Sequence, residues 1–268
     1  MTLDDLAALA REAGREIYAV WKAGVTVTTK LDGSPVTIAD QRAEAIILAG
    51  LNVLAPDIPV IAEEESAAGR TPSVRRRFFL VDPLDGTRGF SEGKPDYTVN
   101  IGLIVDNVPV MGVIYAPATG DLYAGGNGEA WKSSCDTATA EETGVRTALR
   151  VSDATEKFVL VGSHSFDGPK FKAFAKAVGA GKTSSASSSL KFCRVAEGSA
   201  DIYPRFGGLC EWDVAAGHAI LRAAGGGVVR IDGSELVYGR ALEDFELDGV
   251  IAFGGAAAEQ AARAAIRR

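Results

Sequence analysis

Two aspartates stand three residues apart in the segment VDPLDGTRGF, residues 81–90, which follows directly on an apolar run. Pro83 biases Asp82 towards an extended backbone, and Gly86 permits a positive φ that other residues resist. The bend therefore folds Asp85 back towards Asp82. Two carboxylates held together in this way can bind a cation or cap a turn.

A third acid, Glu63, follows another short apolar run, residues 58–62. If this run and the run at 78–81 are neighbouring strands of one sheet, Glu63 and Asp82 emerge at the same edge. Gathered carboxylates repel one another, and a divalent cation removes that cost. An Asp-Gly pair alone more often caps a turn, whereas the full run with Glu63 one strand away favours a metal site.

The composition narrows the choice of metal. The chain has two histidines, and its three cysteines include no CxxC pair, so a zinc site is disfavoured. Donor sets made only of oxygen favour Mg²⁺ or Mn²⁺. A further acid, Asp213 in EWDVAAGHAIL (211–221), is well placed as the N-cap of the helix that follows, which is the simpler interpretation of that residue.

Helical and strand patterns alternate in the elements that must position these acids. A helix over residues 2–22 carries apolar residues at helical spacing, with Thr2 as its cap. A second helix is predicted over 37–54, and strands on either side of Asp106 and Asn107 predict an antiparallel hairpin. The later part of the chain predicts strands at 158–162, 200–204, 227–231 and 248–253, and helices at 169–178, 189–197, 213–224 and 255–267.

The chain has 268 residues, which suits one large domain or two moderate ones. A polar stretch near 133–146 predicts a division into two parts. We expect residues 1–140 to form an N-terminal α+β part with the metal-binding motifs. We expect residues 141–268 to form a C-terminal α/β part that carries Asp213 and the stretch expected to select a nucleotide.

Charge and composition disfavour several classes of protein. The net charge of −7 argues against a general nucleic-acid binder. No uncharged apolar stretch reaches the roughly 18 residues of a membrane span, and the acidic start predicts a helix rather than a signal peptide. With its unpaired cysteines, the sequence indicates a cytoplasmic protein, either free or peripheral at the inner membrane, and either a monomer or a homodimer.

Four motifs in order resemble the inositol monophosphatase superfamily of Mg²⁺-dependent, lithium-sensitive phosphatases. They are GSPVTIAD (33–40), AEEES (62–66), DPLDGT (82–87) and WDVAAGHAIL (212–221). The stretch SSLKFCRVAEGSADIYPRFG (188–207) is similar to the 3′(2′),5′-bisphosphate nucleotidase (CysQ-type) branch. The resemblance implies an α/β fold of the α+β kind, a layered α/β/α/β/α sandwich of the inositol monophosphatase and fructose-1,6-bisphosphatase type.

The resemblance also implies roles for individual residues. The implied metal ligands are Glu63, Asp82, the Leu84 carbonyl, Asp85 and Asp213. The implied catalytic residues are Glu63, Thr87 and Asp40, of which the last two orient the attacking water. The implied substrate contacts are Glu63, Leu84, Asp85, Gly86, Thr87, Lys191, Arg205 and Asp213. Two or three Mg²⁺ ions and inhibition by Li⁺ complete the implied chemistry.

The implied activity is Mg²⁺-dependent removal of the 3′-phosphate of 3′-phosphoadenosine 5′-phosphate (PAP), with its sulfated form PAPS as a further substrate. Lys191 and Arg205 would offer positive charge to the second phosphate. Arg88 and Gly89 follow the DPLDGT motif where the branch usually has Lys-Glu, and this departure bears on substrate preference. The alternatives are an inositol-1-phosphatase or broad sugar-phosphate phosphatase with the same chemistry, and a non-catalytic protein that binds Mg²⁺ and a nucleotide.

Overall fold

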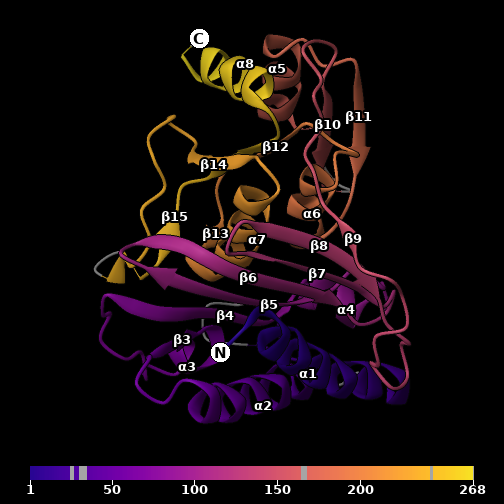
Figure 1. Ribbon diagram of the computed structural model, residues 1–268, viewed down its shortest axis with the longest axis vertical. Helices are drawn as coiled ribbons and strands as arrows, with labels where there is room; N and C mark the ends of the chain where they lie inside the picture. The colour runs from indigo at the N-terminus through magenta and orange to yellow at the C-terminus, as the bar shows by residue number, and fades with distance from the viewer. Residues whose placement is uncertain (25–26, 30–34, 164–167, 242–243, 268) are drawn as a thin grey trace.

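Two β-sheets alternate with three layers of helices in the order α/β/α/β/α, as the implied fold class predicted (Figure 1). The structure, a computed structural model, describes residues 1–24, 27–29, 35–163, 168–241 and 244–267. Gly33 and Ser34 of the motif GSPVTIAD lie outside the described residues.

The first helical layer consists of α1 (Leu3–Ala23) and α2 (Ile38–Leu54), which pack together on one face of a seven-stranded sheet. Thr2 caps α1 as predicted. Before α2, the short strands β1 (Val27–Thr29) and β2 (Pro35–Thr37) pair antiparallel. The seven strands lie in chain order: β3 (Val60–Ala62), β4 (Arg77–Asp85), β5 (Thr98–Val105), β6 (Val108–Ala116), β7 (Asp121–Gly126), β8 (Glu129–Ser134) and β9 (Thr147–Ala148).

The middle layer contains α6 (Leu190–Ala196) and α7 (Glu211–Ala223), which lie between the two sheets. The second sheet has the order β11-β10-β12-β16-β14, and α5 (Pro169–Ala177) and α8 (Ala256–Ile266) cover its outer face. Its strands are β10 (Val159–Gly162), β11 (Lys182–Ser185), β12 (Ile202–Arg205), β14 (Gly227–Arg230) and β16 (Val250–Phe253). The smaller elements are α3 (Glu63–Ala67), α4 (Thr87–Ser91), β13 (Leu209–Cys210) and β15 (Glu246–Leu247).

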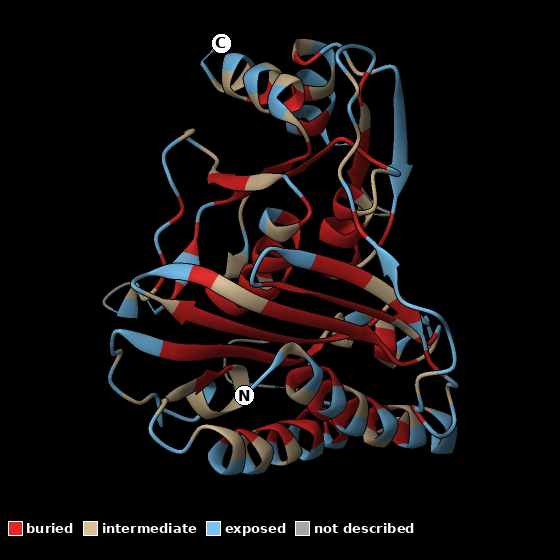
Figure 2. Cartoon of the chain, in the orientation of Figure 1, coloured by how far each residue is buried: buried red, intermediate tan, exposed pale blue. Residues whose placement is uncertain are grey.

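Buried apolar side chains form three clusters between the layers, and the exposed residues line the outer helix faces and the loops (Figure 2). The central interface is tight, because α7 lies directly on the first sheet. A Cβ on Gly112 of β6 would stand 2.3 Å from the carbonyl oxygen of Ala216 in α7. This close packing fixes the position of the helix that carries Asp213 relative to the sheet that carries Asp82.

Most predicted elements are present, with shifted ends. The hairpin between β5 and β6 turns at Asp106 and Asn107, both at positive φ. The strands β7 and β8 have no counterpart in the prediction, and the predicted strand at 78–81 is too short. The division of the chain at residue 140 stays a prediction, although β9 lies beyond that point and still pairs with β8. No helix in the described ranges is long and apolar enough to cross a membrane.

Candidate active site

Glu63 and Asp82 emerge side by side at one edge of the first sheet, as the two apolar runs predicted. The strands β3 and β4 are parallel neighbours, and Ala62 pairs with Val81. Glu63 is the first residue after β3, and Asp82 follows Val81 within β4. Parallel pairing therefore brings two acids from segments 19 residues apart in the sequence to the same place.

The strand β4 does not end before Asp82, which corrects the predicted boundary. Asp82 pairs with Asn100 and Asp85 with Thr98, and the register shifts between these two pairs. The irregularity accommodates Pro83, which has no amide hydrogen to donate to a neighbouring strand. Asp82 Oδ1 also accepts a hydrogen bond from the amide of Leu84 at 2.9 Å. The turn-capping role and a place in the acidic cluster thus coexist in one side chain.

Gly86 turns the chain from β4 into α4 with φ 95° and ψ 25°, the left-handed conformation that the sequence predicted. A loop from the other half of the chain closes over this turn. Ser188 Oγ lies 3.0 Å from the carbonyl oxygen of Asp85 and 2.7 Å from that of Asp96. A Cβ on Gly86 would stand 2.3 Å from Ser188 Oγ, so the loop fits only against glycine.

Gly86→Ala is expected to lower the melting temperature by about 2–8 °C. The positive φ costs an alanine about 1–2 kcal/mol, and each kcal/mol corresponds to about 2–4 °C for a chain of this size. Gly93→Ala is the matched control, because Gly93 has φ 76° and no atom within 4 Å of the added Cβ. Thermal unfolding should show the larger loss for Gly86→Ala; equal losses would mean that the Ser188 contact does not matter.

Thr87 and Asp40 lie within hydrogen-bonding distance, as the resemblance implied. Thr87 Oγ is 3.1 Å from Asp40 Oδ1 and 2.9 Å from the carbonyl oxygen of Leu84. The other carboxylate oxygen, Asp40 Oδ2, accepts hydrogen bonds from both the amide and the hydroxyl of Thr37 at 2.8 and 2.7 Å. Asp40 belongs to the first turn of α2 and is buried, so these bonds hold it in one orientation towards Thr87.

Asp213 lies inside the first turn of α7 and not at its N-cap, which corrects the sequence prediction. The N-cap is Cys210, and α7 begins at Glu211. Asp213 is the third helical residue, and its Oδ2 accepts the amide hydrogen of Cys210 at 2.7 Å. This reciprocal capping still directs the carboxylate back towards the start of the helix, where the cavity described below opens.

Burial and like charge raise the pKa values of the three aspartates. Burial raises the pKa of Asp82 well above its usual range, and the charges of Glu63, Asp85 and Asp213 raise it further. Burial likewise raises the pKa of Asp213 to about 8, with Asp85 adding to the effect. Burial also raises the pKa of Asp85, but Lys191 opposes that rise. The cluster therefore carries an excess of buried negative charge.

Two cations, Lys191 and Arg205, oppose the rise in the pKa of Asp85 in this cluster. Lys191 in α6 is buried, donates a hydrogen bond to the carbonyl oxygen of Ser188 at 2.6 Å, and lies 5.4 Å from the centre of the Tyr203 ring. Burial lowers the pKa of Lys191 to about 8, although Asp85 acts in the other direction. Arg205 ends β12 and donates to the carbonyl oxygen of Gly208 at 2.9 Å.

One cavity of about 800 Å³ is lined by both groups. The acids that line it include Glu63, Asp85 and Asp213, and the bases that line it include Lys191 and Arg205. Thr87, Arg88 and Lys94 also line it, and Lys94 forms an ion pair with Glu92. Within the described residues, most of the residues that the sequence singled out line this one cavity. Asp40, Asp82 and Leu84 do not line it, but Asp40 and the Leu84 carbonyl both bind Thr87, and Asp82 is adjacent to the acids that line the cavity.

The carboxylates that line this cavity suit a hard divalent cation. Among the described residues, no group of three or more His, Cys, Asp or Glu side chains stands in the geometry that would hold an ion. The fit therefore rests on the chemistry of the donors. They are carboxylates whose buried charges lack full compensation, and a cation is the species that would relieve this repulsion. The assignment of individual ligands stays a proposal.

Three residues that shape this site have no role in the sequence prediction. Ser188 contacts the turn at Asp85, and the amide of Ser189 donates to the Asp85 carboxylate. Glu44 in α2 binds the amides of Glu64 and Glu65. The serines stand at the start of the quoted stretch 188–207, and Glu44 lies four residues after Asp40, on the same face of a predicted helix.

The sequence of the whole chain carries a family signature. The sequence model of the inositol monophosphatase family matches residues 2–265. The chain belongs to the inositol monophosphatase family.

Relatives within the inositol monophosphatase family carry two kinds of name. The 3′(2′),5′-bisphosphate nucleotidase CysQ of Shigella flexneri is 43% identical over 238 residues, which cover 88% of this chain and 93% of the relative. The inositol-1-monophosphatase of Synechocystis is 32% identical over 84% of this chain and 77% of the relative. The crystal structure of CysQ from Bacteroides thetaiotaomicron superposes with a TM-score of 0.75 at 35% identity, and covers 94% of this chain and 97% of that chain.

Proposed function

We propose that this chain is a cytoplasmic, Mg²⁺-dependent 3′(2′),5′-bisphosphate nucleotidase that removes the 3′-phosphate of PAP, with PAPS as a second substrate to test. The similarity to CysQ proteins supports the class of substrate. The observation that supports it most within the structure is the single cavity that is lined by both the carboxylates and the cations Lys191 and Arg205. In this proposal one phosphate of the substrate binds at the carboxylate-held Mg²⁺ ions, and the second phosphate binds the cations.

In this proposal Glu63, Asp82, Asp85, Asp213 and the Leu84 carbonyl hold the Mg²⁺ ions. Bound Mg²⁺ would neutralise charge on the reacting phosphate and make a nearby water more acidic. Li⁺ would compete for the same oxygens, which is the basis of the proposed lithium sensitivity. The short helix α4, which starts at Thr87, has no side-chain cap at Gly86, and the amides at the start of a helix lack partners within it. These amides and Gly86 would face the phosphate oxygens.

Thr87 and Asp40 orient the attacking water. Thr87 Oγ has one proton, which it donates to Asp40 Oδ1 or to the Leu84 carbonyl, so its lone pairs can accept a hydrogen bond from the water. A proton released by the water can then pass through Thr87 to Asp40. Burial raises the pKa of Asp40 above its usual range, which makes this carboxylate a better proton acceptor than an exposed one.

The wild-type protein is expected to hydrolyse PAP with a kcat/KM at least tenfold higher than that for inositol 1-phosphate. A charge-assisted hydrogen bond to the non-reacting phosphate contributes about 1.5–3 kcal/mol, and inositol 1-phosphate has no such group. Phosphate release from PAP, PAPS, inositol 1-phosphate and fructose 1,6-bisphosphate, with and without a chelator, measures this preference. Arg205→Ala should narrow the gap by lowering kcat/KM for PAP while that for inositol 1-phosphate stays unchanged.

The same panel separates the alternatives. Equal or faster turnover of inositol 1-phosphate would assign the chain to the inositol-1-phosphatase function that the Synechocystis relative is named for. Release that persists after complete chelation would contradict the metal-dependent site. Binding of PAP without any release of phosphate would favour the non-catalytic alternative.

A further inference from the structure

The short helix α3 begins with the proposed metal ligand Glu63 but has no cap of its own. Its N-cap position is Ala62, which makes no side-chain hydrogen bond. The first amides of a helix have no partner within the helix and are usually bound by an N-cap side chain. The amides of Glu64 and Glu65 must therefore find their acceptors elsewhere.

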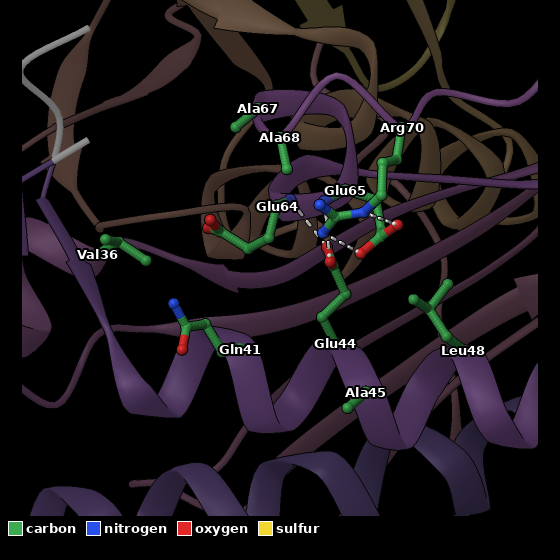
Figure 3. Close-up of a pocket in the computed structure, with 10 residues that line it drawn as sticks. All are labelled: Val36, Gln41, Glu44, Ala45, Leu48, Glu64, Glu65, Ala67, Ala68 and Arg70. Carbon is green, nitrogen blue, oxygen red and sulfur yellow. Dashed lines mark hydrogen bonds and ion pairs between the residues drawn. The ribbon is translucent and has the colours of Figure 1, made fainter. Parts of the chain in front are cut away.

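Glu44 of α2 supplies those acceptors. Its Oε2 accepts the amide hydrogen of Glu64 at 2.8 Å, and its Oε1 accepts that of Glu65 at 2.9 Å. Glu44 is 4% exposed, and Figure 3 shows its side chain rising from α2 towards the start of α3. One carboxylate with both oxygens engaged thus fixes the two residues directly after Glu63.

Asp40 and Glu44 lie one turn apart on the same helix, and each contacts a different part of the candidate site. Asp40 binds Thr87, and Glu44 binds the turn that carries Glu63. Residues four apart share one face of a helix. Because α2 packs against α1 and against β4, it forms one rigid support for both parts.

We propose that Glu44 is a positioning residue that holds Glu63 beside Asp82 by capping α3, and that this role determines the affinity of the site for divalent cations. The inference rests on the proposed function in so far as Glu63 is a metal ligand. Partners that orient metal ligands typically contribute about 10–100-fold to metal affinity. The bonds of Glu44 to the backbone keep the ligand turn in place before any ion arrives.

Glu44→Gln is the sharpest test, because glutamine keeps the size of the side chain. Its carboxamide has one acceptor oxygen and an NH₂ group that opposes the second amide. We expect the dissociation constant of Mn²⁺, measured by titration of the metal-free protein, to rise at least tenfold. Hydrogen exchange of the Glu64 and Glu65 amides should become faster in the same metal-free protein.

Glu65→Gln is the matched control. It removes one negative charge from the same helix, but the Glu65 side chain pairs with Arg70 and not with the site (Figure 3). Mn²⁺ affinity within about twofold of wild type is expected for this variant. Glu44→Asp keeps the charge but shortens the reach, so it should bind Mn²⁺ less tightly than wild type; if Glu44→Gln does not fold, this variant decides the test.

Unchanged Mn²⁺ affinity in both Glu44 variants would overturn the role of Glu44, whatever substrate the wild type hydrolyses. Equal weakening by Glu44→Gln and Glu65→Gln would also overturn it, because charge alone would then explain the loss. A wild type that binds Mn²⁺, loses affinity in Glu44→Gln and releases no phosphate from PAP would uphold Glu44 and contradict the proposed function.

Discussion

Asp82→Asn is expected to abolish phosphate release and, at the same time, to raise the melting temperature of the metal-free protein. Asp82 is 2% exposed, and Glu63, Asp85 and Asp213 all add to the cost of its charge. Asparagine removes that charge but keeps an oxygen that can accept the Leu84 amide. Relief of about 1 kcal/mol corresponds to a rise of about 2–4 °C.

The gain should depend on pH in a defined direction. An aspartate in an unfolded chain titrates near 3.9, and the folded-state pKa of Asp82 lies well above that value. A carboxyl group with a raised folded-state pKa contributes stability at low pH and loses it as pH rises. The melting temperatures of Asp82→Asn and the metal-free wild type should therefore be similar near pH 4, and their difference should grow as pH rises.

Asp85→Asn provides the comparison within the same cluster. It should also abolish turnover, with a loss of more than about 100-fold, since even partners that only orient ligands contribute 10–100-fold. Its effect on metal-free stability should be smaller than that of Asp82→Asn, because Lys191 opposes the rise in the Asp85 pKa and loses this interaction when Asp85 is replaced. A fall in melting temperature for Asp82→Asn, measured by calorimetry after chelation, would contradict the repulsive cluster.

The part of this site that sequence could predict is the part that local rules determine. The ends of two apolar runs predicted that Glu63 and Asp82 would meet, and parallel pairing of β3 and β4 brings them together. Gly86 adopts the positive φ that an Asp-Gly turn favours. The pairing of Thr87 with Asp40 could be inferred only through the family resemblance, because 47 residues separate them in the chain.

Other features depend on packing between distant segments. The contact of Ser188 with the turn at Asp85 spans 103 residues and exists only because the middle helical layer docks on the first sheet. The continuation of β4 past Pro83 requires a register shift that the residue pattern alone does not predict. Asp213 was misplaced by three positions, because aspartate favours both the N-cap and the third position of a capping box, and Cys210 is an uncommon N-cap.

The same dependence on packing explains why the sequence alone predicts no role for Glu44. A glutamate in the second turn of an amphipathic helix normally faces solvent. Residues 63–65 are also glutamates, so the sequence suggests repulsion, and not a hydrogen bond, between Glu44 and this segment. Glu44 is buried because α3 packs on α2 and has no side-chain cap of its own, so that its first amides bind the Glu44 carboxylate. Burial raises the pKa of Glu44 to about 7, and its two backbone hydrogen bonds act against that rise.

Thr87→Val is expected to lower kcat for PAP by about 10²–10⁴-fold, the usual contribution of a group that positions or transfers a proton. Valine has nearly the shape of threonine but no hydroxyl, so Asp40 Oδ1 loses the partner that lies 3.1 Å away and the water loses its acceptor. KM for PAP should stay within a few-fold of wild type, because Lys191 and Arg205 are unaltered. The affinity for Mn²⁺ should also stay within a few-fold, because the proposed metal ligands are unaltered.

Thr87→Ser separates the hydroxyl from the methyl group. Serine can make the same bonds to Asp40 and to the Leu84 carbonyl, so this variant should keep kcat within about tenfold of wild type. Steady-state kinetics at saturating Mg²⁺, combined with Mn²⁺ titration, distinguish loss of the water-orienting group from loss of metal. A Thr87→Val enzyme that keeps wild-type kcat would contradict the roles of Thr87 and Asp40 in the mechanism. The proposed metal ligands would then have to activate the water without them.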